Sequence, residues 1–380
     1  MALTWDELAG RSLARQFPAH GGLDPGDVVD LVGRIGPIQS QTARSPFIGL
    51  AARRPGLTHW AISAAYEMHG IVRGSTLRGT VHTCTAPDHA VLDAATRIGQ
   101  RTMFARNLRL ADATLEEVWA AQEAYAAASW RSPADLHTHL RDWIAAHDPS
   151  ARPQLDSTAG RYFSLGFGSL LRKPLRGTWS AQGAPGYRTA TSVLGADPMR
   201  DRLRADPDTG VDMIVRRHLT AYGPSSRNDI AWWSGIGLRP IDAALARLAD
   251  TLTHDEGPDG RVYWDLPRAP SMGQPPPLAL LPEYDALLCG YDPPARARFV
   301  DPEHYDILWK QENGLLLAPV LIDGRLRGYW RLTGTGRRRD LAIRYVKGAR
   351  RPTKSALAEP ISALKMALDS TIGAVDIGRD

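Results

Sequence analysis

The chain has 380 residues, enough for roughly two to four domains, and 43% of them are hydrophobic, which is ample for packed cores. A charged content of 23% is ordinary for a soluble protein, and the net charge of +5 permits a nucleic-acid partner without requiring one. No apolar run approaches the length of a membrane span, and the N-terminus lacks the basic and apolar regions of a signal peptide. We therefore expect a cytoplasmic protein and no membrane partner.

Residues 1–110 are predicted to hold an N-terminal helix, three further helices and two paired strands. Asp24 followed by Pro25 indicates a helix start, because a carboxylate caps free backbone N–H groups and proline fits the first turn. Thr58 can cap a later helix in the same way. The expected elements are helices over Pro25–Arg34, from Ser45-Pro46 onward and over Thr58–Met68, and strands over Ile71–Arg73 and Gly79–Cys84.

Two later segments, residues 111–205 and 206–268, repeat this order of three helices and two strands. In the first we expect helices over Leu115–Ala128, Ser132–Ala145 and Asp156–Phe167, and strands over Leu170–Arg172 and Tyr187–Ala190. In the second we expect helices over Val211–Ala221, Pro224–Trp233 and Leu238–Ala249, and a hairpin of Thr251–His254 with Arg261–Asp265. Trp232 and Trp233 are expected in the core, with a base-stacking platform as the alternative. The order is that of a winged helix, although other small α/β units share it and winged helices also bind proteins.

The proline-rich segment Pro267–Pro277 is the best candidate for a linker. Beyond it, over residues 278–380, short apolar runs alternate with turn signals such as Asp323-Gly324. We expect a small antiparallel barrel or sheet, closed by a helix over Thr353–Leu368. The expected strands include Gly314–Asp323, Arg327–Leu332 and Leu341–Val346. The predicted fold class is therefore α+β, with three tandem winged-helix domains and a C-terminal antiparallel β-barrel.

Two glutamines, Gln39 and Gln41, lie one residue apart just after the first predicted helix stops. In extended backbone, residues two positions apart point the same way, so both carboxamides are placed to hold one small molecule such as a water. No acidic residue occurs between positions 31 and 66, whereas several arginines do, and this environment suits an anionic polymer. A solvated pair of surface glutamines is the alternative interpretation.

The sequence gives little support for a metal site, for the serine nucleophile of an α/β-hydrolase or for a nucleotide cofactor. His137 and His139 face different directions on a helical pattern, and His82 and His89 have no cysteine or acidic partner at ligand spacing. The chain has no Gly-x-Ser-x-Gly elbow, and its glycine-rich stretches lack the third glycine and lysine of a phosphate-binding loop. Its two cysteines are expected to be reduced, with one long-range disulfide as the alternative. We therefore expect no metal and no cofactor.

Clusters of basic residues indicate surfaces that contact phosphates. Residues 331–354 carry nine Lys or Arg and one acid, and Arg337 and Arg338 lie in the expected hairpin tip Gly334–Arg339. Residues 157–176 lack acids and include Arg172 and Lys173, and residues 97–109 form another acid-free basic stretch. Phosphate contacts would give salt-dependent affinity that is independent of sequence. A solvated face is the alternative for each cluster.

Four short blocks of sequence, spread along nearly the whole chain, resemble segments of a known protein family and occur in the same order as in that family. They are Gly36–Gln41, Arg78–Cys84, Leu281–Leu288 and Pro319–Trp330. On these blocks the chain resembles the AlkZ-like DNA glycosylases, a bacterial winged-helix family with AlkZ and YcaQ branches, and it is closer to the AlkZ branch. The resemblance implies three winged-helix domains and a C-terminal β-barrel around a C-shaped channel for duplex DNA. It also implies removal of N7-alkylated purines, including bulky natural-product adducts and crosslinks.

The resemblance also suggests roles for individual residues. The AlkZ branch carries a Gln-aliphatic-Gln catalytic motif, which Gln39 and Gln41 match, while Ser40 stands in place of the aliphatic residue. His82 is then either a DNA-backbone contact or a satisfied strand histidine, and Arg44 is the candidate phosphate anchor. Two further candidate DNA contacts reach toward the groove from a barrel loop: Arg296 and Arg298.

The leading hypothesis is a monofunctional DNA glycosylase that acts as a monomer on double-stranded DNA containing alkylated guanine. Gln39 and Gln41 would position a water for attack on C1′ and release the N7-alkylguanine base, in DNA repair or antibiotic self-resistance. The alternatives are a non-catalytic winged-helix regulator and a protein that only binds lesions. Binding alone does not require the two glutamines, so they distinguish these hypotheses.

Overall fold

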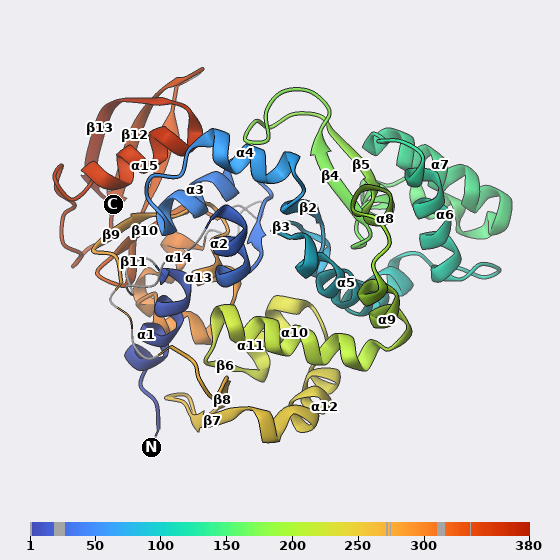
Figure 1. Ribbon diagram of the computed structural model, residues 1–380, viewed down its shortest axis with the longest axis horizontal. Coiled ribbons are helices and arrows are strands. Elements are labelled where there is room, and N and C mark those ends of the chain that lie inside the picture. Colours follow the sequence, from blue (N-terminus) through green and yellow to red (C-terminus); the bar gives the residue numbers. More distant parts are fainter. Residues whose placement is uncertain (1, 19–26, 271–272, 274, 310–315, 335) are drawn as a thin grey trace.

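The computed structural model describes residues 2–18, 27–270, 273, 275–309, 316–334 and 336–380, and it shows a mixed α+β protein (Figure 1). The predicted helix start at Asp24 and Pro25 lies outside these residues, as do Thr335 of the basic hairpin and positions 314–315 of an expected strand. Among the described residues, no helix is long and apolar enough to cross a membrane. Cys84 and Cys289 are buried free thiols, as expected.

The N-terminal helices begin at side chains that cap free backbone N–H groups. Thr4 and Glu7 form a reciprocal capping box at the first helix. The second helix begins after Asp27, whose carboxylate accepts from the backbone N–H groups of the next turn at 2.7 and 3.0 Å. Thr58 caps the fourth helix, as predicted. The elements are α1 (Trp5–Gln16), α2 (Val28–Ile35), α3 (Ser45–Arg53) and α4 (His59–Glu67).

The predicted strands of the first two segments form one antiparallel sheet, in the order β1-β3-β2-β4-β5. β2 pairs with β3 along its length, and β4 continues the sheet where Leu171 pairs with Gly74. Position 74 requires glycine because a Cβ there would lie 2.9 Å from the carbonyl oxygen of Leu170. Strands from two segments of the chain therefore share a single sheet. Its members are β1 (Ile38–Gln39), β2 (Ile71–Ser75), β3 (Val81–Thr85), β4 (Leu170–Pro174) and β5 (Pro185–Thr189).

A long helix, α5, follows β3 and was not predicted from the sequence. Its buried residues include Leu92, Ala95 and Phe104, and they lie on several sides, so no single apolar stripe marks the helix. The helix predicted over residues 156–167 is wrong, because Ser157 has extended backbone and starts a second 3-10 helix there. The elements are α5 (Ala86–Asn107), α6 (Leu115–Ala127), α7 (Pro133–His147), η3 (Pro149–Leu155) and η4 (Thr158–Ser164).

The helices and hairpin expected between residues 206 and 268 are present. Ser226 caps α11 through a capping box with Asp229, and β6 adds a third strand to the hairpin, in the order β6-β8-β7. Two short helices precede them. The elements are α8 (Ala190–Leu194), α9 (Pro198–Ala205), α10 (Pro207–Tyr222), β6 (Ser225–Ser226), α11 (Arg227–Ser234), α12 (Leu238–Leu248), β7 (Thr253–Glu256) and β8 (Val262–Asp265).

The C-terminal part forms a curled five-stranded sheet, in the order β13-β12-β11-β10-β9. The expectation of an all-antiparallel sheet is wrong at its edge, because α15 returns the chain so that β13 pairs parallel to β12. The strands are β9 (Leu278–Leu280), β10 (Ala318–Ile322), β11 (Arg325–Thr333), β12 (Arg338–Tyr345) and β13 (Thr371–Arg379). The helical elements of this part are α13 (Ala286–Cys289), η6 (Pro294–Arg298), η7 (Pro302–His304), α14 (Tyr305–Leu308) and α15 (Ala358–Leu368).

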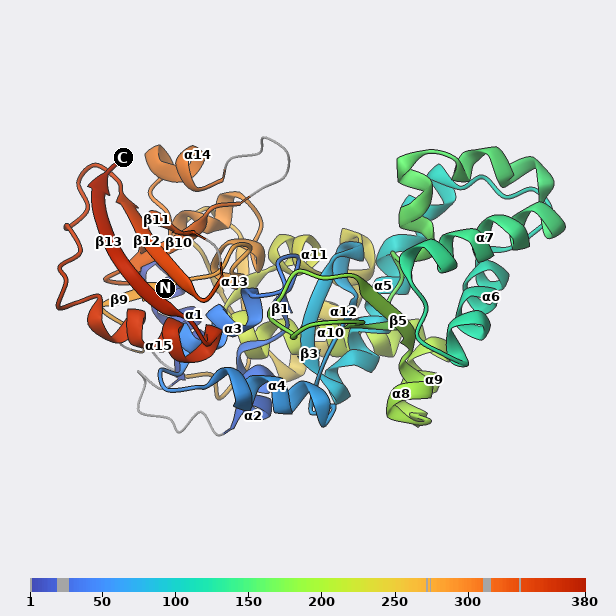
Figure 2. The same cartoon turned by 90° about the horizontal axis from the view of Figure 1, so that it is seen from above.

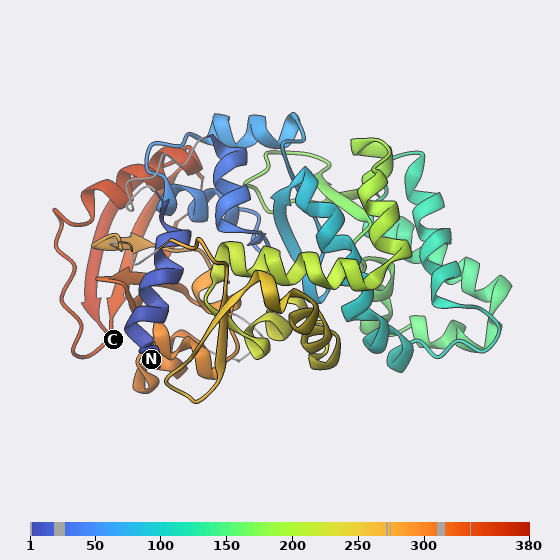
Figure 3. The same cartoon turned by 60° about the horizontal axis from the view of Figure 1, so that its bottom comes forward.

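The C-terminal sheet and the α6–α7 pair lie at opposite ends of the molecule (Figure 2). Between them, α10 contacts α1, α5, α9 and α12 (Figure 3). The largest hydrophobic cluster joins α10 to these four helices and reaches the C-terminal sheet, and it includes Leu13 of α1, Leu92 of α5, Leu219 of α10 and Leu288 of α13. A second cluster is formed by α2, α3 and α4, and Ile38 of the strand that carries Gln39 packs against it.

Candidate functional site

The strand that carries Gln39 is placed by a close approach to α10. Gly36 ends α2 with φ 89°, and a Cβ at that position would lie 2.5 Å from the hydroxyl oxygen of Tyr222. The Tyr222 hydroxyl in turn donates a hydrogen bond to the carbonyl of Pro37 at 3.2 Å. β1 then pairs with β3, which sets Gln39 opposite His82.

Arg78 orients the carboxamide of Gln39. Its Nη2 lies 3.3 Å from the Gln39 Oε1, and its Nη1 donates to the main-chain carbonyl of Trp233. Because a guanidinium can only donate, the oxygen of the Gln39 carboxamide must be the atom that faces Arg78. Arg78 has the left-handed φ of 56°, and burial lowers the pKa of its guanidinium. Arg78 begins one of the blocks on which the family resemblance rests, but this contact was not predicted from the sequence.

Gln41 lies in a different environment from Gln39. β1 ends at Gln39, and Gln41 follows in a bend with an exposed side chain, whereas Gln39 is 8% exposed. The extended backbone that was expected to align the two carboxamides therefore does not continue to Gln41. The structure brings the two residues into one short loop, with one side chain at a protein hollow and the other at the surface.

Ser40, between the glutamines, ends a chain of hydroxyl groups. Its Oγ lies 2.9 Å from both the carbonyl oxygen of Ile38 and the Thr83 Oγ1, and the Tyr66 hydroxyl lies 2.5 Å from the same Thr83 atom. Arg73 donates to the Tyr66 hydroxyl at 3.1 Å. Since Arg73 can only donate and a carbonyl can only accept, every hydroxyl in the chain donates toward Ile38. Ser40 is 2% exposed and fixes the loop from within.

The loop between β4 and β5 holds the same region from outside. Trp179 stacks on Tyr66 with ring centroids 4.2 Å apart, and the Arg73 Nη1 donates to the Trp179 carbonyl at 3.2 Å. The Gln182 Oε1 accepts from the backbone N–H of Ala43 at 3.1 Å. The glutamine loop is therefore fixed by residues that are far apart in the sequence.

His82 is a neutral, buried side chain. It is 2% exposed, and burial together with the nearby Arg78 lowers its pKa to about 3. Its Nδ1 lies 3.0 Å from the Thr76 Oγ1 and 3.2 Å from the Thr80 carbonyl. A neutral imidazole that is satisfied within the strand fits the structural interpretation of His82 better than a charged contact with the DNA backbone.

A hollow of about 470 Å³ opens beside Gln39. We call it the aromatic hollow. No described residue that lines it carries a carboxylate. Trp232 was expected in the core, but it is 41% exposed here, while Trp233 is buried. The lining of the hollow includes Gln39, Arg78, Trp232, Arg296, Tyr305 and Trp309.

The other predicted DNA contacts lie apart from the glutamine loop, except for Arg44. Arg44 is partly exposed and donates to the Glu283 Oε1 at 2.6 Å, so a phosphate would compete with a carboxylate for it. Arg172 and Lys173 border a separate pocket of about 230 Å³ beside Trp130 and Trp179, with the Lys173 Nζ 4.5 Å from the Trp130 ring centre. In the C-terminal sheet, Arg337 is exposed just before β12 and forms an ion pair with Asp369, and Arg338 is exposed at the first position of β12.

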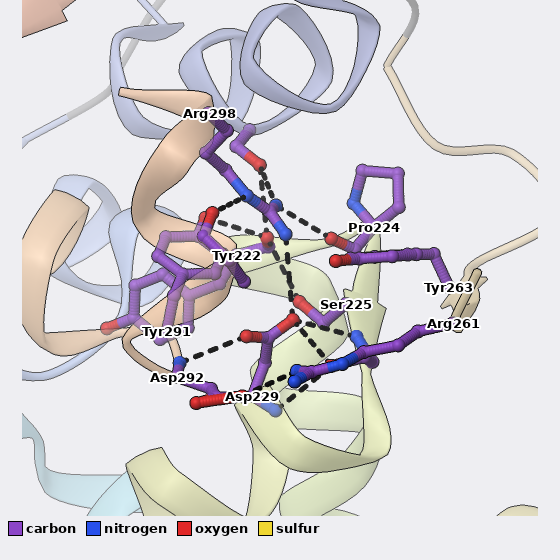
Figure 4. Close-up of polar contacts among 12 residues, drawn as sticks. Tyr222, Pro224, Ser225, Asp229, Arg261, Tyr263, Tyr291, Asp292 and Arg298 are labelled. Atoms are coloured by element: carbon purple, nitrogen blue, oxygen red, sulfur yellow. Dashed lines mark hydrogen bonds and ion pairs between the residues drawn. The ribbon is translucent and has the colours of Figure 1, made fainter. Parts of the chain in front are cut away.

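Arg296 and Arg298 are fully buried, so neither offers an exposed guanidinium to a DNA phosphate in this structure. Arg298 donates to the carbonyls of Ala295 and Pro224 at 3.1 and 3.0 Å, and its Nη2 lies 3.5 Å from the Asp229 Oδ2 (Figure 4). Burial raises the pKa of Asp229, and Arg298 opposes that rise. Arg298 therefore joins η6 to α11 in the interior. Arg296 faces the aromatic hollow.

Comparison with known proteins places this chain in a family of DNA glycosylases. The family model for AlkZ-like DNA glycosylases matches residues 32–366. The fold is similar to that of the Streptomyces sahachiroi DNA glycosylase AlkZ, with a TM-score of 0.77 and 18% identity over 99% of each chain. No curated protein matches the sequence. The chain belongs to the AlkZ-like DNA glycosylase family, which confirms the resemblance seen in its sequence.

Replacing Ser40 with alanine is expected to lower the free energy of unfolding by about 1–3 kcal/mol, because the Thr83 hydroxyl loses its buried acceptor. Urea unfolding followed by tryptophan fluorescence measures the change. Thr42→Ala, which removes a hydroxyl from a half-buried residue of the same loop, is the matched control. Equal stability of the Ser40 variant and wild type would show that the hydroxyl chain does not hold the loop.

Arg298→Met is expected to lower the free energy of unfolding by about 3–5 kcal/mol, because Asp229 loses its buried cation. Where the Arg298→Met variant remains folded, the slope of log affinity against log salt concentration should equal that of wild type, because the buried Arg298 makes no phosphate contact. The loss of one phosphate contact would change that slope by about one. Arg337→Met is the exposed control, expected to change stability by no more than about 0.5 kcal/mol. A stable Arg298 variant with a shallower salt slope would place Arg298 on DNA.

Proposed function

We propose that this protein excises N7-alkylguanine from double-stranded DNA by hydrolysing the bond between the base and C1′. The single observation that carries the proposal is a strand-borne carboxamide, Gln39, held by Arg78 at an aromatic hollow that none of the described residues provides with a carboxylate. Membership of the AlkZ-like DNA glycosylase family supports DNA as the substrate. The match of Gln39 and Gln41 to the family's catalytic motif supports their role.

The chemistry agrees with a site that lacks a general acid. An N7-alkylguanine is already cationic, so it leaves as a neutral base without protonation. What remains is to position a water at C1′ and to stabilise the positive charge that develops on the sugar. Carboxamide oxygens do both, since they accept hydrogen bonds from water and present the negative end of a dipole to the sugar.

Arg78 leaves Gln39 suited to this role. A carboxamide oxygen has two lone pairs, and Arg78 uses one, so the other remains to accept a water proton. The same contact fixes the carboxamide in one orientation before substrate arrives, which reduces the reorganisation needed during reaction. Gln41 is exposed in the adjacent bend, and under the proposal it contacts the substrate from the surface side.

We further propose that the lesions include bulky adducts or crosslinks, as in resistance to a DNA-alkylating natural product, and that the protein acts as a monomer on one duplex. The similarity of the fold to the Streptomyces sahachiroi DNA glycosylase AlkZ supports DNA as the substrate. A non-catalytic protein that binds lesions is the second candidate. It would bind the same DNA and release no base.

The double substitution Gln39→Ala with Gln41→Ala is expected to slow single-turnover release of the base from an N7-methylguanine duplex by at least about a hundredfold. Chromatography of the released base measures the rate directly. Gln154→Ala is the matched control, because Gln154 lies far along the chain and bonds with the backbone of Arg109. Wild-type rates in the double variant would refute the glutamine mechanism, and no release by wild type would favour the lesion-binding candidate.

The rate of base release is expected to be independent of pH between about 5.5 and 8.5, because His82 and Cys289, which lie near Gln39, keep one protonation state over this range. His82 has its pKa lowered to about 3 and stays neutral, and burial raises the pKa of Cys289 to about 11, so it stays a thiol. Single-turnover rates across this range test the expectation. A titration with a midpoint near 6.5 would show that His82 gains a proton in the working enzyme.

The stability of the folded protein also depends on pH, and this limits how low a pH can be used to measure the rate of base release. The pKa of His82 is lower in the folded protein than its ordinary value of 6.5, so the unfolded chain binds the proton more tightly. His82 therefore lowers the stability of the folded state progressively as pH falls from 6.5 toward 3. Circular dichroism at each pH separates loss of fold from loss of rate.

A further inference from the structure

The aromatic hollow has the chemistry of a binding site that the excision mechanism does not use. Tyr305 and Trp309 line it from one segment of the chain, and Trp232 lines it from α11. The guanidinium carbon of Arg296 lies 3.7 Å from the centre of the Trp309 ring and 5.1 Å from that of Trp232. The aromatic side chains thus surround a cation at one wall of the hollow.

Arg296 keeps one nitrogen without a partner among the described residues. Its Nε donates to the Tyr291 carbonyl at 3.1 Å and its Nη1 donates to the Tyr305 hydroxyl, but its Nη2 has no hydrogen-bond partner in the described part of the chain. The residue is 0% exposed, so this donor lies behind the surface of the hollow, and an acceptor atom of a ligand reaches it only when the covering atoms move aside. A buried donor without an acceptor costs free energy, which a ligand with an acceptor atom would recover.

The charge of the hollow selects among possible ligands. Arg78 and Arg296 are both cationic, and no described lining residue carries a carboxylate to balance them. A cationic ring such as the alkylated guanine itself is disfavoured there. A neutral flat ring with an acceptor oxygen is favoured, since it can stack on tryptophan and accept from the Nη2 of Arg296.

We propose that the aromatic hollow binds a neutral aromatic substituent of the adduct that carries a carbonyl or similar acceptor oxygen. The proposal rests on the proposed function, because Gln39 lines the same hollow and would place the damaged nucleotide at its rim. A volume of about 470 Å³ holds one substituted aromatic ring system with room to spare. The hollow is then a specificity site for the adduct, separate from the groups that attack C1′.

The test compares duplexes with N7-phenacylguanine, which has a ring and a carbonyl, N7-(2-phenylethyl)guanine, which has only the ring, and N7-(cyclohexylmethyl)guanine, which has neither. Wild type should bind and process the phenacyl lesion about tenfold better than the cyclohexylmethyl lesion, with the phenylethyl lesion between them. Fluorescence anisotropy gives binding, and chromatography of the released base gives single-turnover rates.

Trp232→Ala is the informative variant, because Trp232 is 41% exposed and its loss leaves the core intact. It should reduce the preference for the phenacyl over the cyclohexylmethyl lesion to about twofold or less. Arg296→Met should remove the advantage of phenacyl over phenylethyl, with circular dichroism as the check on folding. Trp60→Ala, an exposed tryptophan of α4 outside the hollow, should keep the wild-type preference.

The outcomes separate this proposal from the proposed function. Base release without preference for the aromatic lesions, or a preference that survives Trp232→Ala, would overturn the hollow as a specificity site and leave the glycosylase standing. Tight, Trp232-dependent binding of the phenacyl duplex without base release would support the hollow and overturn the glycosylase mechanism. Preference in both binding and release, lost in Trp232→Ala, would support both.

Discussion

The contact between Arg78 and Gln39 is the constraint on which the site depends. Arg78 reaches from the turn between β2 and β3 to the carboxamide of Gln39 and to the main-chain carbonyl of Trp233 in α11. One guanidinium thus fixes the candidate catalytic group and ties it to the helix that supplies Trp232 to the aromatic hollow. The left-handed backbone at Arg78 and the absence of a side chain at Gly79, where a Cβ would overlap the Tyr162 hydroxyl, make this reach possible.

The shared sheet explains why a loop with few contacts of its own has a defined geometry. β1 has two residues, which is too short to hold a position alone. β3 pairs with it on one side, and the β4–β5 loop covers the following residues through Trp179 and Gln182. Arg73 joins these two supports, because it bonds with Tyr66 and with the carbonyls of Ala43 and Trp179. A charged donor at the head of a hydroxyl chain strengthens each bond along it.

Local patterns in the sequence predicted most elements, because caps such as Thr58 and alternating strands act over a few residues. They did not predict that Gln41 leaves the extended backbone of Gln39. Contacts over long separations were not predictable. The family resemblance predicted a DNA contact for Arg298. In the structure this residue is buried and contacts Asp229 and Pro224, which are distant from it in the sequence. The aromatic hollow forms because α11 and α14 line the same space, and no local pattern in the sequence predicts that these two helices come together. The helix α5 was missed because its buried residues do not fall on one face.

The charges at the site suit a reaction in which positive charge moves from the damaged base to the sugar. In an N7-alkylguanine the positive charge begins on the base and moves to the sugar as the bond to C1′ breaks. Under our proposal, Arg296 faces the adduct from the wall of the hollow and makes charge on the base unfavourable. The Gln39 oxygen faces the sugar, where charge is wanted. Because the base leaves as a neutral molecule, bond breaking needs no group that gains or loses a proton, which agrees with the lack of a carboxylate among the described residues of the hollow.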